Sequence, residues 1–225
     1  MNSDLPKVLH KIGNKTLIEH VIDTANKLNS DKIIAIVGYK KEIIKKQLSH
    51  LNIEYAIQNQ QLGTGHAIKQ CEKNINNLNG DILILSGDVP MISEKTLMNL
   101  IKEHKNNKSL ATLISATIKD PTGYGRIKRD ENNNFTSIIE HKDANKNDLL
   151  IKEINAGIYI FDIKTLFNKL SKINNNNNQK EYYLGDVLQY IDKNKISIYN
   201  TPNFNEILGI NNKEQLNEII KKTAV

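Results

Sequence analysis

Two short segments of the chain contain the residue types that bind phosphate groups and metal ions. The first, QNQQLGTGHA at residues 58–67, places glycines on both sides of Thr64 and predicts a turn that opens a helix. Amides at the start of a helix can bind a phosphate or a nucleobase, and glycine lets the backbone approach a ligand closely. The second, LILSGDVP at residues 83–90, predicts a buried strand followed by Asp88. A carboxylate at that edge of an α/β sheet suits Mg²⁺, so the two segments predict a nucleotide and metal site.

Each motif also has a purely structural interpretation. The two glycines are equally typical of an ordinary turn from strand to helix, and Asp88 can cap the helix that follows it. Gln58, at a strand end, offers a donor and an acceptor to a nucleobase edge. His66 lies in the first turn of the predicted helix, where a histidine can be a ligand, a base or a structural residue. The local sequence leaves both interpretations open.

Three later segments are weaker candidates. PTGYGR at residues 121–126 is a turn with two glycines and an arginine, and EHKD at residues 140–143 is a polar cluster at a strand end. Either one also fits a simple loop between strands. Asn155 lies inside an apolar strand, where a buried amide needs partners, and a sugar hydroxyl is one such partner.

The composition predicts a globular, soluble chain. Of its 225 residues, 39% are hydrophobic and 25% are charged, which is typical of a chain that buries a core. Cys71 is the single cysteine, so no internal disulfide is possible and a reducing cytoplasm is expected. No apolar run approaches the roughly 20 residues of a membrane span, and the first residues contain no signal-peptide core.

The formal net charge of +6 raises the question of nucleic-acid binding. The lysines are interleaved with acidic residues along the chain, whereas nucleic-acid binding requires a clustered basic face. We therefore expect no nucleic-acid partner and no membrane partner. A modest positive field suits an anionic substrate such as a nucleoside triphosphate.

Helical and strand patterns alternate along the chain. Apolar spacing predicts helices at residues 16–28, 41–51, 65–72, 93–105, 163–170, 182–191 and 213–221. It predicts strands at residues 32–37, 53–57, 81–85, 109–116, 125–128, 135–140, 153–161 and 196–200. Repeated β-α units favour a three-layer α/β fold with a mainly parallel mixed sheet. Without an internal repeat or a long linker, residues 1–225 are expected to form one domain.

In their order and spacing, eight segments closely resemble the N-terminal uridylyltransferase domain of the bacterial bifunctional GlmU family. The segments are SDLPKVLH, QLGTGHA, GDVP, PTGYGR, EHKDA, EINAGIYIF, NNNNNQKEYYLGDV and GINN. The resemblance implies a Rossmann-like nucleotidyltransferase fold. It also implies Mg²⁺-dependent uridylyl transfer from UTP to N-acetylglucosamine 1-phosphate, which makes UDP-N-acetylglucosamine for the cell envelope. In-line attack of the sugar phosphate on UTP would release pyrophosphate without a covalent enzyme intermediate.

The same resemblance assigns roles to individual residues. Lys7 would contact substrate phosphate and serve catalysis together with Asp88, and Asp88 and Asn211 would hold Mg²⁺. The positions implied to read uracil are Gln58, Gly63 and Thr64. Those implied to contact the sugar are Gly125, Glu140 and Asn155. Ser86, where relatives often have tyrosine, is expected beside the bound substrate.

The chain departs from the family pattern at both ends. The family motif L-x-x-G-x-G-T-x-M-x-S-x-x-P-K is represented only by its tail, MNSDLPK. The first strand, the glycine-rich loop and the catalytic arginine of that motif are not in the sequence. We expect a gap between the strands at residues 32–37 and 81–85, with unpaired backbone groups. Either an internal methionine was taken as the start or the chain is truncated.

The hexapeptide repeats of the family's acetyltransferase domain are not in the sequence either. We expect neither acetyltransferase activity from this chain nor the trimer that this domain builds in relatives. Two alternatives to the main hypothesis remain. One is a pyrophosphorylase for another sugar 1-phosphate, such as glucose 1-phosphate. The other is a non-catalytic module that binds the nucleotide or the sugar, which the lack of the glycine-rich loop favours.

Overall fold

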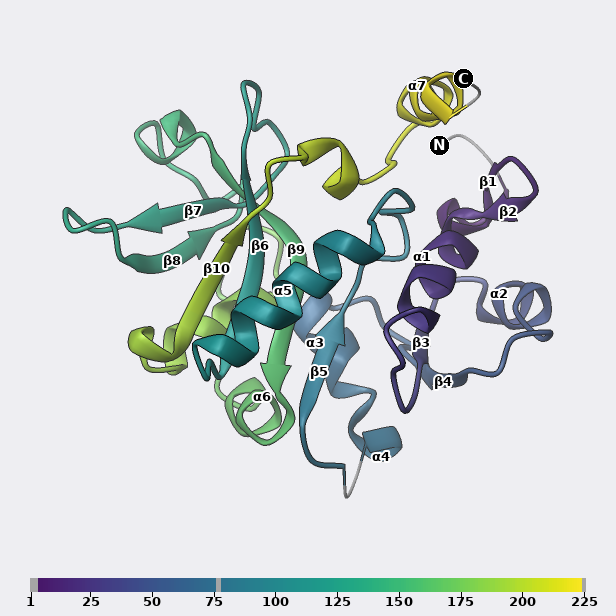
Figure 1. Ribbon diagram of the computed structural model, residues 1–225, viewed down its shortest axis with the longest axis horizontal. Coiled ribbons are helices and arrows are strands. Elements are labelled where there is room, and N and C mark those ends of the chain that lie inside the picture. Colours follow the sequence, from purple (N-terminus) through teal and green to yellow (C-terminus); the bar gives the residue numbers. More distant parts are fainter. Residues whose placement is uncertain (1–3, 76–77, 224–225) are drawn as a thin grey trace.

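The computed structural model describes residues 4–75 and 78–223, and these form an α/β fold (Figure 1). The strands are β1 (Lys11–Ile12), β2 (Lys15–Thr16), β3 (Ile34–Val37), β4 (Glu54–Ile57), β5 (Asp81–Ile84), β6 (Ala111–Thr117), β7 (Arg126–Arg129), β8 (Phe135–Ile139), β9 (Glu153–Asp162) and β10 (Ile196–Asn200). The α-helices are α1 (Leu17–Asn26), α2 (Lys41–Gln47), α3 (Thr64–Lys69), α4 (Glu72–Ile75), α5 (Glu94–Asn106), α6 (Ile163–Leu170) and α7 (Lys213–Thr223). Five 3₁₀ helices span Lys7–Leu9, Asp148–Leu150, Leu184–Tyr190, Lys193–Lys195 and Phe204–Ile207. Within the described ranges, no helix is long and apolar enough to cross a membrane.

A mixed sheet of six strands forms the centre of the fold. Its order is β10-β6-β9-β7-β8, and β5 pairs with β9. Strand β9 is ten residues long and antiparallel to β5, β6 and β7, whereas β10 is parallel to β6. The α/β class and the mixed sheet are therefore confirmed. Parallel pairs do not predominate among the described strands, because β9 returns through the centre of the sheet.

Side chains that alternate along β9 pack against helices on both faces of the sheet. Ile158 and Ile160 join one apolar cluster with α5, whose Leu97 and Leu100 are fully buried. Tyr159 and Phe161, which alternate with these two along the strand, join a second cluster with α6 and the 3₁₀ helix Leu184–Tyr190. Successive side chains of a strand point to opposite faces, so the two clusters lie on the two faces of the sheet. Figure 1 shows α5 crossing in front of the sheet.

Most of the predicted elements are present, with three differences. The helix expected at residues 65–72 is two short helices, α3 and α4. The helix expected at residues 182–191 is a 3₁₀ helix, and its start is fixed because the Tyr182 amide donates to the Leu62 carbonyl at 2.8 Å. The small hairpin β1-β2 was not predicted, since each of its strands has only two residues.

Strands β3 and β4 form a separate parallel pair, and a cavity separates them from the main sheet. Among the described residues, β3 pairs only with β4 and β5 pairs only with β9. Consecutive residues of both strands, 33–37 and 81–85, line a cavity of about 890 Å³. Apolar side chains such as Val21, Ile68 and Cys71 line its remaining walls. A gap between these two strands is what the departure from the family pattern predicted.

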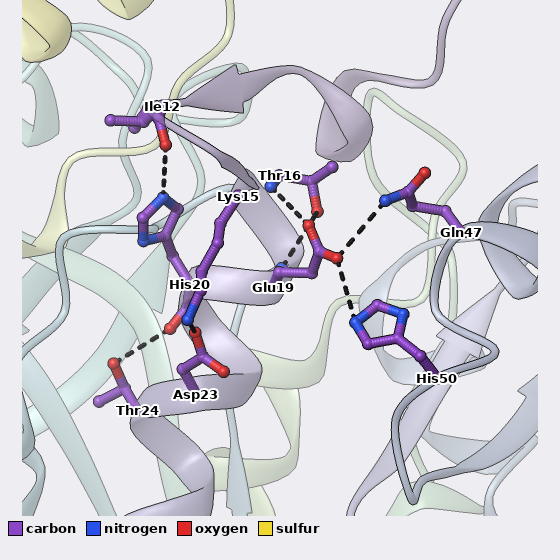
Figure 2. A network of polar contacts seen from close by, with 9 residues as sticks. All are labelled: Ile12, Lys15, Thr16, Glu19, His20, Asp23, Thr24, Gln47 and His50. Carbon is purple, nitrogen blue, oxygen red and sulfur yellow. Dashed lines mark hydrogen bonds and ion pairs between the residues drawn. The ribbon is translucent and has the colours of Figure 1, made fainter.

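The N-terminal segment is anchored through a buried carboxylate (Figure 2). Thr16 caps α1, and Glu19 accepts hydrogen bonds from the Thr16 amide and hydroxyl, both at 2.6 Å. The other Glu19 oxygen lies 3.4 Å from Nε2 of Gln47 and 3.5 Å from Nε2 of His50. Burial acts to raise the pKa of Glu19, but these hydrogen bonds and His50 outweigh it and lower the pKa below its usual value. This contact fixes α1 against the α2 region, directly after the segment that carries Lys7.

Candidate functional site

Three residues far apart in the sequence meet at one point. Lys7 begins the 3₁₀ helix Lys7–Leu9, Asp88 lies in the loop after β5, and Asn211 lies just before α7. The Lys7 Nζ donates to Oδ2 of Asp88 at 2.5 Å and to Oδ1 of Asn211 at 2.8 Å. The structure thus brings together the lysine and the two residues expected to hold the metal ion.

Backbone contacts keep the two oxygen donors in place. The Ile210 amide donates to the Asp88 carbonyl at 2.9 Å, which ties the chain before α7 to the loop after β5. The Asn211 amide donates to Oε1 of Gln215 in the first turns of α7 at 2.7 Å. At Gly209, a Cβ would lie 3.7 Å from Oδ2 of Asp88, so the chain passes in van der Waals contact with the carboxylate. Contacts of the backbone at residues 88 and 209–211 therefore position the side-chain oxygens of Asp88 and Asn211.

This donor set fits a hard divalent cation. A carboxylate oxygen and an amide oxygen both point at the ammonium group of Lys7. A divalent cation could be bound by the same two oxygens. The part of the chain that the structure describes has no cluster of three or more His, Cys, Asp or Glu residues placed to hold a metal ion. Mg²⁺ commonly binds through one or two protein oxygens, with substrate phosphates and water completing its shell. Asp88 and Asn211 would hold it in that way.

The residues expected to read uracil belong to a loop that is clamped against a distant segment. The Gly65 amide donates to the Tyr182 carbonyl at 2.7 Å, and the Thr64 hydroxyl accepts from the Leu184 amide at 3.0 Å. Gly63 has φ of +105°, and a Cβ there would lie 2.6 Å from the Tyr182 carbonyl oxygen. Only glycine allows both this backbone conformation and this contact.

Gln58 stabilises the same loop from within. It is buried directly after β4, and its Nε2 lies 3.0 Å from both the Gly63 carbonyl oxygen and Nδ1 of His66. These contacts support the structural interpretation of His66, because the imidazole is held by Gln58 and by Gln70. Gln58, Gly63 and Thr64 are thus brought together, and their contact with a nucleobase stays a prediction.

The three residues expected at the sugar also lie together. The Asn155 amide donates to the Gly125 carbonyl at 2.9 Å, and a Cβ on Gly125 would lie 3.1 Å from a Glu140 carboxylate oxygen. The Asn155 side chain is buried, with 8% of the residue exposed, and its Nδ2 donates to the Tyr159 hydroxyl at 2.6 Å. Its Oδ1 accepts from the Gly157 amide at 3.1 Å. The partners of this buried amide therefore come from its own strand.

Glu140 belongs to a group of carboxylates that share a poorly solvated region. Burial raises the pKa of Glu140 to about 7, and the negative charges of Asp186, Asp143 and Glu181 act in the same direction. Burial, followed by the charge of Asp143, raises the pKa of Asp186 to about 6. Carboxyl groups of this kind can accept or donate hydrogen bonds near neutral pH. Such groups suit the hydroxyl and amide groups of a sugar.

Two residues lie between the group expected to hold the metal ion and the group expected to contact the sugar. Ser86 lies two residues before Asp88, and its hydroxyl is 3.7 Å from where a Cβ on Gly157 would lie. Burial, together with the nearby charge of Asp88, raises the pKa of Tyr124, while a hydrogen bond with the Gly209 backbone opposes that shift. The loop after β5 therefore faces both groups.

Sequence reasoning did not select Tyr124, Tyr159 or Asp186 for the site. For Asp186 a signal exists, because Gly-Asp-Val recurs at residues 87–89 and 185–187. The two tyrosines lie within segments that resemble the GlmU family, but nothing in their local pattern separates them from core aromatics. They are distinguished only by the effect of the Asp88 charge on Tyr124 and by the hydrogen bond of Tyr159 with Asn155.

Comparisons with known proteins show the family to which the chain belongs. The model of the nucleotidyl transferase family matches residues 2–207. The bifunctional protein GlmU of Bacillus cereus strain AH187 is 43% identical over 230 aligned residues, which cover 100% of this chain and 50% of that protein. The GlmU protein of Bacillus anthracis strain CDC 684 has the same identity and coverage. The chain thus spans about half the length of the curated relatives it matches.

Solved structures show the same fold. The crystal structure of apo UDP-glucose pyrophosphorylase is similar with a TM-score of 0.72 and 19% identity, covering 97% of this chain and 92% of that one. HddC from Yersinia pseudotuberculosis is similar with a TM-score of 0.69 and 19% identity, covering 99% of this chain and 92% of the other. The resemblance inferred from the sequence is confirmed: the chain belongs to the nucleotidyl transferase family.

Proposed function

We propose that the chain transfers a uridylyl group from UTP to N-acetylglucosamine 1-phosphate and releases pyrophosphate. The observation that carries this proposal is the convergence of Lys7, Asp88 and Asn211, because it joins a cation for phosphate to an oxygen pair for Mg²⁺. The 43% identity to GlmU proteins over the whole chain supports the choice of nucleotide and sugar. The product would serve synthesis of the cell envelope.

The chemistry requires positioning and charge neutralisation. A phosphate oxygen of the sugar phosphate forms a bond to the α-phosphorus of UTP, and the bond between that phosphorus and the oxygen bridging to the β-phosphate breaks. Lys7 would contact the phosphates, and Asp88 and Asn211 would hold Mg²⁺, which supplies positive charge to the phosphates when bound. No side-chain nucleophile is needed, and burial raises the pKa of the sole thiol, Cys71, to about 12.

Two further groups would orient the substrates. The clamped loop with Gln58, Gly63 and Thr64 would hold the uracil, because its backbone is fixed against residues 182–184. Gly125, Glu140 and Asn155 would contact the sugar, with Ser86 between this group and Asp88. Orientation of this kind lowers the barrier of a two-substrate reaction by reducing its entropic cost. We place the reaction in the cytoplasm, where UTP is made, and treat residues 1–225 as one domain.

The test is pyrophosphate release from UTP with N-acetylglucosamine 1-phosphate and, in parallel, with glucose 1-phosphate. The chain is compared with a version extended upstream by the family's first strand and glycine-rich loop. We expect Mg²⁺-dependent release with N-acetylglucosamine 1-phosphate, at least in the extended form, and its loss in Asp88→Asn but not in Asp23→Asn. A preference for glucose 1-phosphate would reject the proposed substrate. UTP binding without release in either form would favour a non-catalytic binding module.

A further inference from the structure

We propose that Lys7 is a built-in competitor of the divalent cation: its ammonium group neutralises the Asp88–Asn211 oxygen pair and must leave it before the cation binds. The inference rests on the proposed function, since it concerns the cation of the same site. It assigns Lys7 a second position, on the two residues that would hold the cation, in addition to a position on substrate phosphate.

The geometry shows why both cations cannot occupy the oxygen pair. The Lys7 Nζ lies 2.5 Å from Oδ2 of Asp88 and 2.8 Å from Oδ1 of Asn211, so it takes the direction from which each oxygen would contact a metal ion. A divalent cation held by these two oxygens would need the space beside them that the ammonium group occupies. Two positive charges so close repel strongly in a partly buried site. The ammonium group therefore has to move away.

The side chain of Lys7 is free to make this move while its backbone stays in place. Its exposed fraction is 37%, compared with 20% for Asp88, so the ammonium group borders on solvent. The backbone is fixed, because the Leu9 amide donates to the Pro6 carbonyl at 2.9 Å and the Leu9 side chain is buried. A lysine has a flexible four-carbon stem that lets its charge change partners. Only the end of the side chain has to exchange one anionic partner for another.

The exchange has a consequence for the order of binding. In the absence of substrate, Lys7 lowers the affinity of Asp88 and Asn211 for a free divalent cation. A cation that arrives with a nucleotide also brings phosphate groups, which offer the displaced ammonium group a new partner. Lys7 would thus favour the metal–nucleotide complex over the bare cation.

The test measures Mn²⁺ binding to the whole chain without nucleotide or sugar phosphate, using the electron paramagnetic resonance signal of free Mn²⁺. Lys7→Met removes the ammonium group and keeps the length of the side chain. The matched control is Lys15→Met, which breaks an equally short ion pair with Asp23, 2.5 Å long and exposed. We expect Lys7→Met to lower the Mn²⁺ dissociation constant about two- to fivefold, as release of one competing, partly exposed ion pair implies. Lys15→Met should leave it unchanged.

Two more variants locate the effect. Lys7→Arg keeps the positive charge and should show no gain in affinity, and Lys7→Gln should show the same gain as Lys7→Met. The gain must disappear in the double variant Lys7→Met with Asp88→Asn. An unchanged or weaker affinity in both uncharged Lys7 variants would overturn the proposal, and so would a gain that survives loss of Asp88. The titration contains no substrate, so a gain in affinity without any uridylyl transfer would reject the proposed function alone.

Discussion

The carbonyl oxygen of Tyr182 lies 2.6 Å from the point where a Cβ on Gly63 would be, and the Tyr182 amide nitrogen lies 2.8 Å from it. Two backbone segments are thus packed directly on each other, without a side chain between them. The same segments are joined by hydrogen bonds from the Gly65 amide to Tyr182 and from the Tyr182 amide to Leu62. The orientation of the loop expected to hold uracil therefore depends on one glycine.

Replacing Gly63 with alanine should destabilise the fold more than an equivalent change elsewhere. Gly80 is the matched control, because its φ of +109° is close to the +105° of Gly63 but nothing lies within 4 Å of its Cβ position. We expect Gly80→Ala to cost about 1–2 kcal/mol from backbone strain. Gly63→Ala carries the same strain plus the contact with Tyr182, and should cost at least about 2 kcal/mol more. Urea denaturation measures both, and equal losses would contradict the clamp.

The sequence predicted the local segments of the candidate site better than the contacts between segments that are far apart in the chain. Asp88 lies in the loop after a strand, as predicted from the apolar run followed by Gly-Asp-Val-Pro, but β5 is half-buried and antiparallel to β9 rather than a buried strand of a parallel sheet. The resemblance alone placed Lys7 and Asn211 in one site, and it did not predict their contact, since no local pattern connects the start of the chain with the segment before α7. Asp186 and Tyr159 were missed because their importance depends on which strands and loops pack around Glu140 and Asn155.

Tyr159→Phe should destabilise the protein by leaving a buried amide with one partner fewer. The Tyr159 hydroxyl accepts from Asn155 Nδ2 at 2.6 Å, and both residues are buried. Loss of a partner from a buried polar group costs about 1–3 kcal/mol. The control is Tyr199→Phe, where the lost partner is the Nδ2 of Asn99 at 3.1 Å and neither residue is fully buried. Thermal unfolding should show the larger loss for Tyr159→Phe, and the reverse order would refute the assignment.

Two carboxylates should give opposite pH dependences of stability. Burial raises the pKa of Glu140 from 4.5 to about 7, so its contribution to stability is complete below pH 4.5 and is lost as the pH rises to about 7. The Glu140→Gln variant has no such titrating group. Its free energy of unfolding, relative to that of the wild type, should therefore increase between pH 4.5 and pH 7 by at most about 3 kcal/mol. The same variant should raise the KM for the sugar phosphate if Glu140 contacts the sugar.

Glu19→Gln is the control, because its stability should change with pH in the opposite direction. Hydrogen bonds and His50 lower the pKa of Glu19 against the effect of burial, so its contribution is present above its usual pKa and is lost as the pH falls through the lowered value. The variant should therefore be less stable than wild type at neutral pH, with a difference that narrows in acid. Denaturation midpoints between pH 3 and pH 8 measure both trends. Parallel curves for the two variants would contradict the assigned environments.

The cavity between β3 and β5 predicts the response of the chain to an added strand. Strand β3 pairs on one side with β4, and strand β5 pairs on one side with β9. Residues of both strands line a cavity of about 890 Å³ with mostly apolar walls. An extended apolar segment there would pair backbone groups of both strands and bury apolar side chains. We expect extension of the chain upstream by the family's first strand to raise the melting temperature by at least about 5 °C. An extension of equal length with proline at alternate positions cannot pair and should leave it unchanged. Amide hydrogen exchange shows where the chain is stabilised. Slower exchange confined to β3 and β5 in the first extended form supports strand pairing in the cavity. Equal exchange in both extended forms excludes such pairing, because an unpaired tail stabilises neither strand edge.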